Sequence, residues 1–348
     1  MDQIDLIIAQ AKYLVFLAFI LGLGIVGLTA VLYLFAQLYK QRGREKRSLE
    51  FVVLQVAVPR DNEIKIDAAE QMFALLSSIK KSHRLFGWLK TQEHLCFEIV
   101  GKKEDIRFYV SAPKRLEDMV EKQIHGTYPG ADVKEVDEYN IFTDYGKVAF
   151  ASLKLANAAF YPIQIYKNLP VDPLNSITAA LAKMGDNEGA IVQVLISPAD
   201  HKWQKSGRSY IAKTKKTESD PEKAKYNVDP KTYEEIENKC SKAGFNVSVR
   251  LVVSSTTKES AEAHLTNLVS SFTQFNSDHN SFSKAKVRLK KLFMIDFIYR
   301  YQPLLGAKSI LSTEELATIF HFPNKTVETP HVLWLQAKRA PADRKSVV

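Results

Sequence analysis

The uncharged run from Tyr13 to Tyr39 is the feature that most constrains what this chain can fold into. A helix needs about 20 apolar residues to cross a bilayer, so this run is long enough to span one with some tilt. A cleaved signal peptide would have a basic start, a shorter apolar stretch and a small-residue cleavage site. The N-terminus instead carries two aspartates against one lysine. We therefore predict a retained transmembrane helix over residues 13–39, with residues 1–12 outside the cytoplasm.

The segment after the apolar run, residues 40–48, is strongly basic. Positive charge is retained on the cytoplasmic side of a membrane. We therefore expect a single-pass protein of the cytoplasmic (inner) membrane, with its soluble region in the cytoplasm. The same cations suit contacts with anionic headgroups or nucleic acid. The candidate contact residues in this linker are Lys40, Arg42, Arg44, Lys46 and Arg47.

Length and composition indicate an ordinary folded chain. At roughly 150 residues per domain, 348 residues predict about two domains plus the anchor. Apolar residues make up 46% and charged residues 25%, which excludes a disordered chain. The formal charge of +9 is compatible with nucleic acid, anionic lipid or neither. Cys96 and Cys240 are too few for a disulfide scaffold, so we expect buried free thiols in a reducing compartment.

Residues 49–140 show the order strand, helix, strand, strand, helix, strand. The expected strands are rich in β-branched residues, and the expected helices carry apolar residues three and four apart. Asp67 and Glu70 stand at the positions of a capping box before the first helix. This order is that of the split β-α-β, or ferredoxin-like, fold. The predicted strands are 50–58, 94–100, 106–111 and 132–136.

The same order recurs over residues 147–291. We therefore predict an α+β fold with two tandem ferredoxin-like units behind the transmembrane helix. The similarity lies in the order of elements, not in sequence identity. In this second unit an insertion, residues 199–244, interrupts the central hairpin. The predicted strands are 148–155, 190–196, 245–254 and 282–289.

The insertion begins with a basic stretch, residues 201–226, that holds eight Lys or Arg against three acids. The second half of the insertion, from Pro230 to Cys240, has the pattern of a surface helix. A basic loop with interleaved aromatics can bind nucleic acid through phosphate contacts and base stacking. A solvated lysine-rich loop is the commoner alternative. The basic strand expected over 284–291 is a second candidate contact. The candidate residues of the insertion are Lys202, Trp203, Lys205, Arg208, Tyr210, Lys213, Lys215 and Lys216.

The C-terminal segment, residues 292–348, contains one clear helix start. Ser312 and Glu315 have the spacing of a capping box, which predicts a short helix over 316–320. Three prolines follow, so we expect an extended tail that acts as a linker. His321 lies between two phenylalanines, which is more typical of a packed ring than of a metal ligand.

Motifs of catalysis are missing from the sequence. There is no P-loop, no H-E-x-x-H, no paired Cys/His spacing for zinc and no G-x-S-x-G. A G-x-G-x-x-G pattern at Gly22–Gly27 lies inside the apolar run with no strand before it, so it does not predict a dinucleotide site. We therefore expect no enzyme activity, no catalytic residues, no cofactor and no metal in this chain.

Several segments together resemble the membrane-proximal N-terminal region of type IV secretion or conjugative DNA-transfer coupling ATPases (TraG/HerA/FtsK-like) from candidate-phyla bacteria. The resemblance covers about residues 50–340, and its first-helix block and tail block are the most specific parts. In that family a motor domain follows this region, and its ATP-binding residues have no counterpart here. The segments are Val58-Pro59-Arg60, Ala68-Ala69-Glu70-Gln71-Met72-Phe73, Phe97-Glu98-Ile99-Val100, Ile106-Arg107-Phe108-Tyr109-Val110, Gln123-Ile124, Tyr128-Pro129, Leu311-Ser312-Thr313-Glu314-Glu315-Leu316-Ala317-Thr318, His321-Phe322-Pro323, Thr329-Pro330 and Trp334.

Three hypotheses follow for the function. The first is a non-catalytic, membrane-anchored platform that recruits or orients a translocating ATPase carried on another chain or domain. The second is a membrane-tethered nucleic-acid-binding protein that uses residues 201–226. The third is an unrecognised membrane enzyme. The expected partners are the membrane, a translocation ATPase or further copies of the chain, and DNA; no small-molecule substrate is evident from the sequence.

Overall fold

The computed structural model describes residues 3–41, 48–80, 92–219, 228–303 and 309–335. The chain divides into two compact units. The first contains the N-terminal helix α1 (Gln3–Gln41), and the second contains all the strands that the structure describes. Each unit is described by itself.

Helix α1 is one continuous α-helix. Its most apolar part, Gln10–Ala36, has 27 residues and a mean hydropathy of 2.7. At 1.5 Å per residue, 27 residues extend about 40 Å, which exceeds the roughly 30 Å of a bilayer core. The helix is therefore long and apolar enough to cross a membrane, a property that a signal sequence near the N-terminus would share.

The second unit is mixed α/β and is built on one antiparallel sheet of nine strands. In its first half the strands lie in the order β4-β1-β3-β2, and in its second half in the order β6-β7-β5-β8. The elements of the first half are β1 (Phe51–Ala57), α3 (Ile66–Leu76), β2 (Leu95–Lys102), β3 (Asp105–Pro113), α4 (Glu117–Thr127) and β4 (Asp132–Val136). Those of the second half are β5 (Lys147–Leu155), α5 (Leu174–Leu181), β6 (Gly189–Pro198), β7 (Gly244–Ser255), α8 (Lys258–Ser270) and β8 (Phe282–Lys284).

Strands β2 and β6 join the two halves. They pair antiparallel from Leu95↔Ile196 to Lys102↔Gly189, so the sheet continues without a break from one half to the other. All residues of β6 are buried, as expected for a strand at the centre of a sheet that is covered on both faces.

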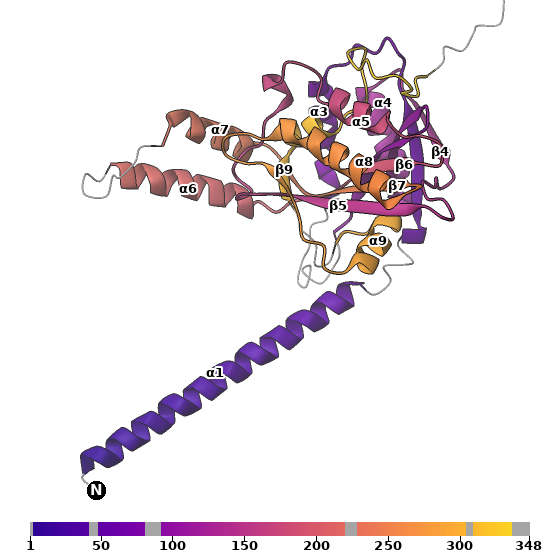
Figure 1. Ribbon diagram of the computed structural model, residues 1–348. Helices are drawn as coiled ribbons and strands as arrows, with labels where there is room; N and C mark the ends of the chain where they lie inside the picture. Colours follow the sequence, from indigo (N-terminus) through magenta and orange to yellow (C-terminus); the bar gives the residue numbers. More distant parts are fainter. Residues whose placement is uncertain (1–2, 42–47, 81–91, 220–227, 304–308, 336–348) are drawn as a thin grey trace, which may run out of the picture. The chain divides into compact units, whose positions relative to one another are not determined.

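Alternate residues of the strands point to opposite faces of the sheet. One face carries the large apolar core and is covered by α3, α4, α5, α8 and the C-terminal helix α10 (Thr313–Ile319). The opposite face, called here the second face, is covered by α9 (Lys290–Ile298) over a smaller apolar cluster that includes Phe293 and Phe297. Figure 1 shows α9 on the side of the sheet away from α3, α4 and α5.

The insertion is a helical hairpin: the helix expected over Pro230–Cys240 is confirmed, and a second helix replaces most of the expected basic loop. Its helices are α6 (Lys202–Glu218) and α7 (Pro230–Ser241), which project from the sheet in Figure 1. The expectation of a loop was wrong for residues 202–218 because an apolar helical face was overlooked. Trp203, Gly207 and Tyr210 recur at helical spacing. They lie against α7, Phe160 and Gly244.

The strand expected over 282–289 was too long, and so the basic strand expected over 284–291 was wrong. Strand β8 ends at Lys284, and the last ladder-like contact is the amide of Ala285 donating to the Ser152 carbonyl over 2.8 Å. Helix α9 then begins at Lys290, because Phe293 and Phe297, four residues apart, pack together onto the second face.

The C-terminal segment was also mispredicted, since described residues after 309 belong to the core instead of forming an extended linker. Strand β9 (Ser309–Ser312) pairs with β7, and α10 follows it with the predicted capping box of Ser312 and Glu315. Phe320 then packs on Phe97, with ring centroids 5.0 Å apart. Burial of these rings holds the segment in place despite its prolines. Residues 336–348 of the expected tail lie outside the described residues.

A capping box at Asp67 and Glu70 does not form. The N-cap of α3 is Lys65, which makes no side-chain capping bond, and Asp67 lies within the first turn. Glu70 instead accepts a hydrogen bond from Lys242, far away in the sequence.

Candidate functional site

A buried ion pair fixes the base of the α6–α7 hairpin. Lys239, near the end of α7, lies 3.0 Å from a carboxylate oxygen of Glu315 in α10, and the two side chains are 2% and 1% exposed. Glu315 also accepts a hydrogen bond from the Ile163 amide over 2.8 Å. Lys239 donates to the Tyr161 carbonyl over 3.0 Å. Burial lowers the pKa of Lys239, and the neighbouring Glu315 carboxylate opposes that shift.

A second set of charges surrounds this pair. Lys242 lies 2.7 Å from both Glu70 of α3 and Glu314 of α10. Lys167 pairs with the other oxygen of Glu314. Burial by itself would raise the pKa of Glu314, but Lys167 and Lys242 bring it below its ordinary value. Lys239 and Lys242 at the end of α7 therefore link this helix to glutamates of α3 and α10, and Lys167 adds a third cation to the same set.

The outer face of α6 carries four exposed lysines, which we call the lysine stripe: Lys202, Lys205, Lys213 and Lys216. Their spacing of three, eight and three residues places them within about 80° of arc at 100° per residue. None of the four forms an ion pair with a residue that the structure describes. The stripe extends over about 21 Å, since 14 residues separate its ends.

The other cations predicted in the insertion are engaged within the hairpin. Arg208 lies 3.3 Å from the Glu237 carboxylate of α7. The Lys215 ammonium lies over the Tyr233 ring, 5.2 Å from its centroid. These two cations therefore face α7 and are not part of the stripe.

The aromatic residues predicted to stack on bases are instead part of the hairpin core. Trp203 is 5% exposed and packs on Gly244, where a Cβ atom would lie 2.6 Å from the indole ring. Tyr210 stacks on Phe160, with ring centroids 5.1 Å apart. Base stacking on Trp203 was therefore a wrong expectation, because its ring fills the space left by a glycine in β7. Of the linker candidates, Arg42, Arg44, Lys46, Arg47 and the Lys40 side chain lie outside the described residues.

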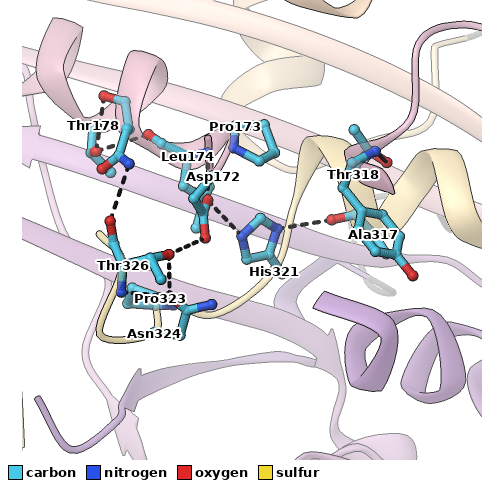
Figure 2. Close-up of polar contacts among 12 residues, drawn as sticks. Asp172, Pro173, Leu174, Thr178, Ala317, Thr318, His321, Pro323, Asn324 and Thr326 are labelled. Atoms are coloured by element: carbon cyan, nitrogen blue, oxygen red, sulfur yellow. Dashed lines mark hydrogen bonds and ion pairs between the residues drawn. The ribbon is translucent and has the colours of Figure 1, made fainter. Parts of the chain in front are cut away.

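A second buried network centres on Asp172 and His321 (Figure 2). Both nitrogens of the His321 ring face acceptor oxygens: Nδ1 lies 2.8 Å from the Ala317 carbonyl oxygen, and Nε2 lies 3.0 Å from Asp172 Oδ1. Asp172 also accepts from the Leu174 amide over 2.9 Å and from the Thr326 hydroxyl over 3.1 Å. Burial alone would raise the pKa of Asp172, but these partners, His321 first among them, bring it below its ordinary value.

This network joins the C-terminal segment to α5. His321 is 1% exposed, and both ring nitrogens already face oxygen atoms, so the ring offers no lone pair to a metal or a substrate. Asp172 lines a cleft of about 790 Å³ together with Lys65, Tyr166 and Asn324. We interpret the network as structural: it holds the C-terminal segment against the start of α5.

A polar row crosses the second face. Glu98 of β2, Gln193 of β6 and Arg250 of β7 are direct cross-strand neighbours, each 1% exposed. Arg250 donates to Gln193 over 3.0 Å, and Gln193 donates to Glu98 over 2.8 Å. Arg250 also donates to the Asp296 carbonyl of α9 over 2.8 Å. The row therefore ties the centre of the sheet to α9.

Arg300 closes the row at its other end. Its Nε donates to both oxygens of Glu98 over 3.1 Å, and its two terminal nitrogens donate to Glu138 over 2.8 and 2.9 Å. Burial alone would raise the pKa of Glu98, but Arg300, Gln193 and Tyr139 bring it below its ordinary value. This row was not predicted. Its signal was a charged or amide side chain in the middle of each of three largely apolar strands.

Possible metal ligands and the two cysteines are further candidates for chemistry in the part of the chain that the structure describes. No group of three or more His, Cys, Asp or Glu residues in that part could hold a metal ion. Cys96 and Cys240 are free and buried, as expected from their number and spacing. Burial raises the pKa of both thiols.

Comparison with known proteins gives a family but no activity. No curated protein matches the chain. A family described as a domain of unknown function (DUF8128) matches residues 37–335, a range that begins in the last turns of α1 and takes in the whole nine-stranded sheet. This chain therefore belongs to the DUF8128 family.

Proposed function

We infer that the chain is a non-catalytic, membrane-anchored assembly module of a type IV secretion-like or conjugative DNA-transfer apparatus. In this proposal it recruits or orients a translocating ATPase. The resemblance of residues 50–340 to the membrane-proximal region of coupling ATPases supplies the class of partner. The long apolar helix α1 supplies the means of attachment.

The observation that carries the proposal is the construction of the α6–α7 hairpin. Its base is held by the buried Lys239–Glu315 pair and by Lys242 between Glu70 and Glu314. Its outer face presents the lysine stripe, which has no ion-pair partners among the described residues. Charges held in a fixed geometry on a projecting element favour binding and orientation of an acidic partner surface.

The proposed membrane topology is a single pass over residues 13–39 of the inner membrane, with the chain from residue 40 onward in the cytoplasm. The basic linker supports this orientation. A reporter that is active only outside the cytoplasm should be inactive when fused after Val348. Activity of that reporter would reverse the topology and remove a cytoplasmic ATPase as partner.

We also propose that the sheet arose from two ferredoxin-like units. Each half follows the strand order 4-1-3-2 of that fold when its strands are numbered within the half. The second strand of each half, β2 and β6, pairs antiparallel with the other, as two copies related by a twofold axis would. Such a fused sheet would provide a wide and rigid platform.

The experiment is a pull-down of the full-length chain from detergent-extracted native membranes, with identification of the proteins recovered. The matched variant carries Lys205→Glu and Lys213→Glu on the lysine stripe, and the control carries Lys183→Glu and Lys258→Glu on α5–β6 and α8 surfaces. The proposal expects a P-loop ATPase with the wild type and the control, and its loss with the stripe variant. Recovery of neither an ATPase nor further copies of the chain would refute it.

A second candidate function is nucleic-acid binding by the lysine stripe, which its regular exposed spacing favours. Four phosphate contacts predict that log K falls with log salt at a slope of about −2.8 for single strands and about −3.6 for duplex DNA. Titration of labelled DNA against the full chain at several salt concentrations measures this slope. Binding that is insensitive to salt, or no binding at low salt, would exclude this function.

A further inference from the structure

A pocket lies on the second face between the sheet, α9 and the segment that follows β8. Its volume is about 570 Å³, within the roughly 300–1,000 Å³ typical of small-molecule sites. Strands β5 and β7 form its floor, and α9 forms one wall. It does not include the lysine stripe or the Asp172–His321 network.

The floor of the pocket is polar. Ser152 of β5 and Arg250 of β7 are cross-strand neighbours. Ser248 precedes Arg250 by two residues, so its side chain lies on the same face of the sheet. The Ser248 hydroxyl is buried and has no hydrogen-bond partner among the atoms that the structure describes. Buried hydroxyls are almost always paired, so an unpaired one that lines a pocket points to a ligand atom.

The walls are apolar and the outer edge is cationic. Val287, Leu292 and Phe293 line the space between floor and edge. Lys286 and Arg288 are exposed at the edge and form no ion pair with any described residue. Together with Arg250 they place three cations around the pocket against one carboxylate, Asp296.

We propose that this pocket binds a phosphorylated ring compound of nucleotide size, with a nucleoside monophosphate as its simplest form. An acceptor atom of the ring takes the hydrogen bond of Ser248 at the floor, in the positive field of Arg250. The flat faces of the ring lie against Val287 and Leu292. The phosphate lies at the edge between Lys286 and Arg288, where charge-assisted hydrogen bonds are strong.

The pocket has a polar floor, apolar walls and a cationic outer edge, and the ligand must match all three. An acyl chain would have to lie against the Ser248 hydroxyl and Arg250, which the polar floor disfavours. A bare phosphate would leave the apolar walls uncovered. A ring that carries an acceptor at one end and an anionic group at the other satisfies the floor, the walls and the edge together.

The test is isothermal titration calorimetry of the full-length chain in nanodiscs, with AMP and UMP as probes. Separate titrations of adenosine and of inorganic phosphate show how much of the binding affinity comes from the ring and how much from the phosphate. The variants are Ser248→Ala at the floor and Arg288→Glu at the edge. The control is Lys183→Glu, an exposed lysine near α5 that changes the net charge by the same amount as Arg288→Glu.

We expect at least one nucleotide to bind, with adenosine and phosphate each weaker by about tenfold or more. Arg288→Glu should weaken nucleotide binding about tenfold, and Ser248→Ala about two- to tenfold, while Lys183→Glu leaves it unchanged. Arg288 is exposed, so its variant tests the proposal even if Ser248→Ala were to disturb folding. No binding at about 1 mM of either nucleotide, or equal binding by wild type and both pocket variants, would overturn the proposal.

Discussion

Glu315→Gln is the substitution for which the structure gives the largest and most specific expected effect. It removes the only carboxylate that the structure shows paired with the Lys239 ammonium among the described residues, while it keeps the size of the side chain. Removal of one partner of a buried ion pair costs about 3–5 kcal/mol, because the other charge stays buried without compensation. In a chain of 348 residues, with an unfolding entropy of about 2.1 cal/mol/K per residue, that corresponds to a fall of roughly 4–7 °C in the thermal midpoint.

The assay is thermal unfolding of the detergent-solubilised full chain, followed by circular dichroism and tryptophan fluorescence. The control is Glu237→Gln, the same substitution at an exposed residue that pairs with Arg208 on the same hairpin. An exposed pair contributes only about 0–1 kcal/mol, so the control should unfold close to the wild type. Addition of Lys239→Met to Glu315→Gln should recover about 1–3 kcal/mol, since it removes the unpaired charge.

The pH dependence of this variant has a defined sign. The pKa of Lys239 is already lowered by burial, and loss of Glu315 removes the group that opposes that shift. The unfolded chain then binds more protons than the folded chain as pH rises toward about 10.4, so stability rises with pH in this range. The loss of unfolding free energy caused by Glu315→Gln should therefore be smaller at alkaline pH. A free energy of unfolding within about 1 kcal/mol of that of the Glu237→Gln control at neutral pH would show that the buried pair does not stabilise the fold in this way.

Three further predictions concern Asp172, Gly244 and the lysine stripe. The pKa of Asp172 is lowered in the fold, so the stability it contributes should be lost as pH falls below about 4; Asp172→Asn should lower the neutral thermal midpoint and flatten this acid decline. Gly244→Ala should destabilise by about 1–3 kcal/mol and shift the fluorescence of Trp203, because the added methyl group meets the indole ring. Lys205→Glu with Lys213→Glu should change the free energy of unfolding by less than about 0.5 kcal/mol in urea titration, while a larger loss would mean that the stripe supports the fold.

Much of the sheet could be predicted from local sequence. Alternating and β-branched runs located β1, β2, β3, β5, β6 and β7 to within a few residues, because burial of one face imposes a period of two. The Ser312–Glu315 capping box was found in the same way, since its two partners are three residues apart. Signals of this kind depend on neighbours in the chain.

Features that depend on distant partners were missed. Glu98, Gln193 and Arg250 are isolated polar residues in three separate strands, and only the strand register brings them together. The charge of Lys239 suggested a solvent-exposed helix, whereas Glu315 makes its burial possible. The high lysine content of α6 made its apolar face hard to recognise in the sequence. That face packs on α7 and on residues near Phe160, which are distant in the chain.

In the function proposed above, the chain anchors and orients a translocating ATPase. Co-purification of the membrane-extracted full-length chain with its native partners tests this function, with mass spectrometry and particle size determined on the same sample. We expect a large complex that contains a P-loop ATPase and that is lost when Lys205 and Lys213 are replaced by glutamate. Recovery of the chain alone, as a monomer, would rule out the proposed function.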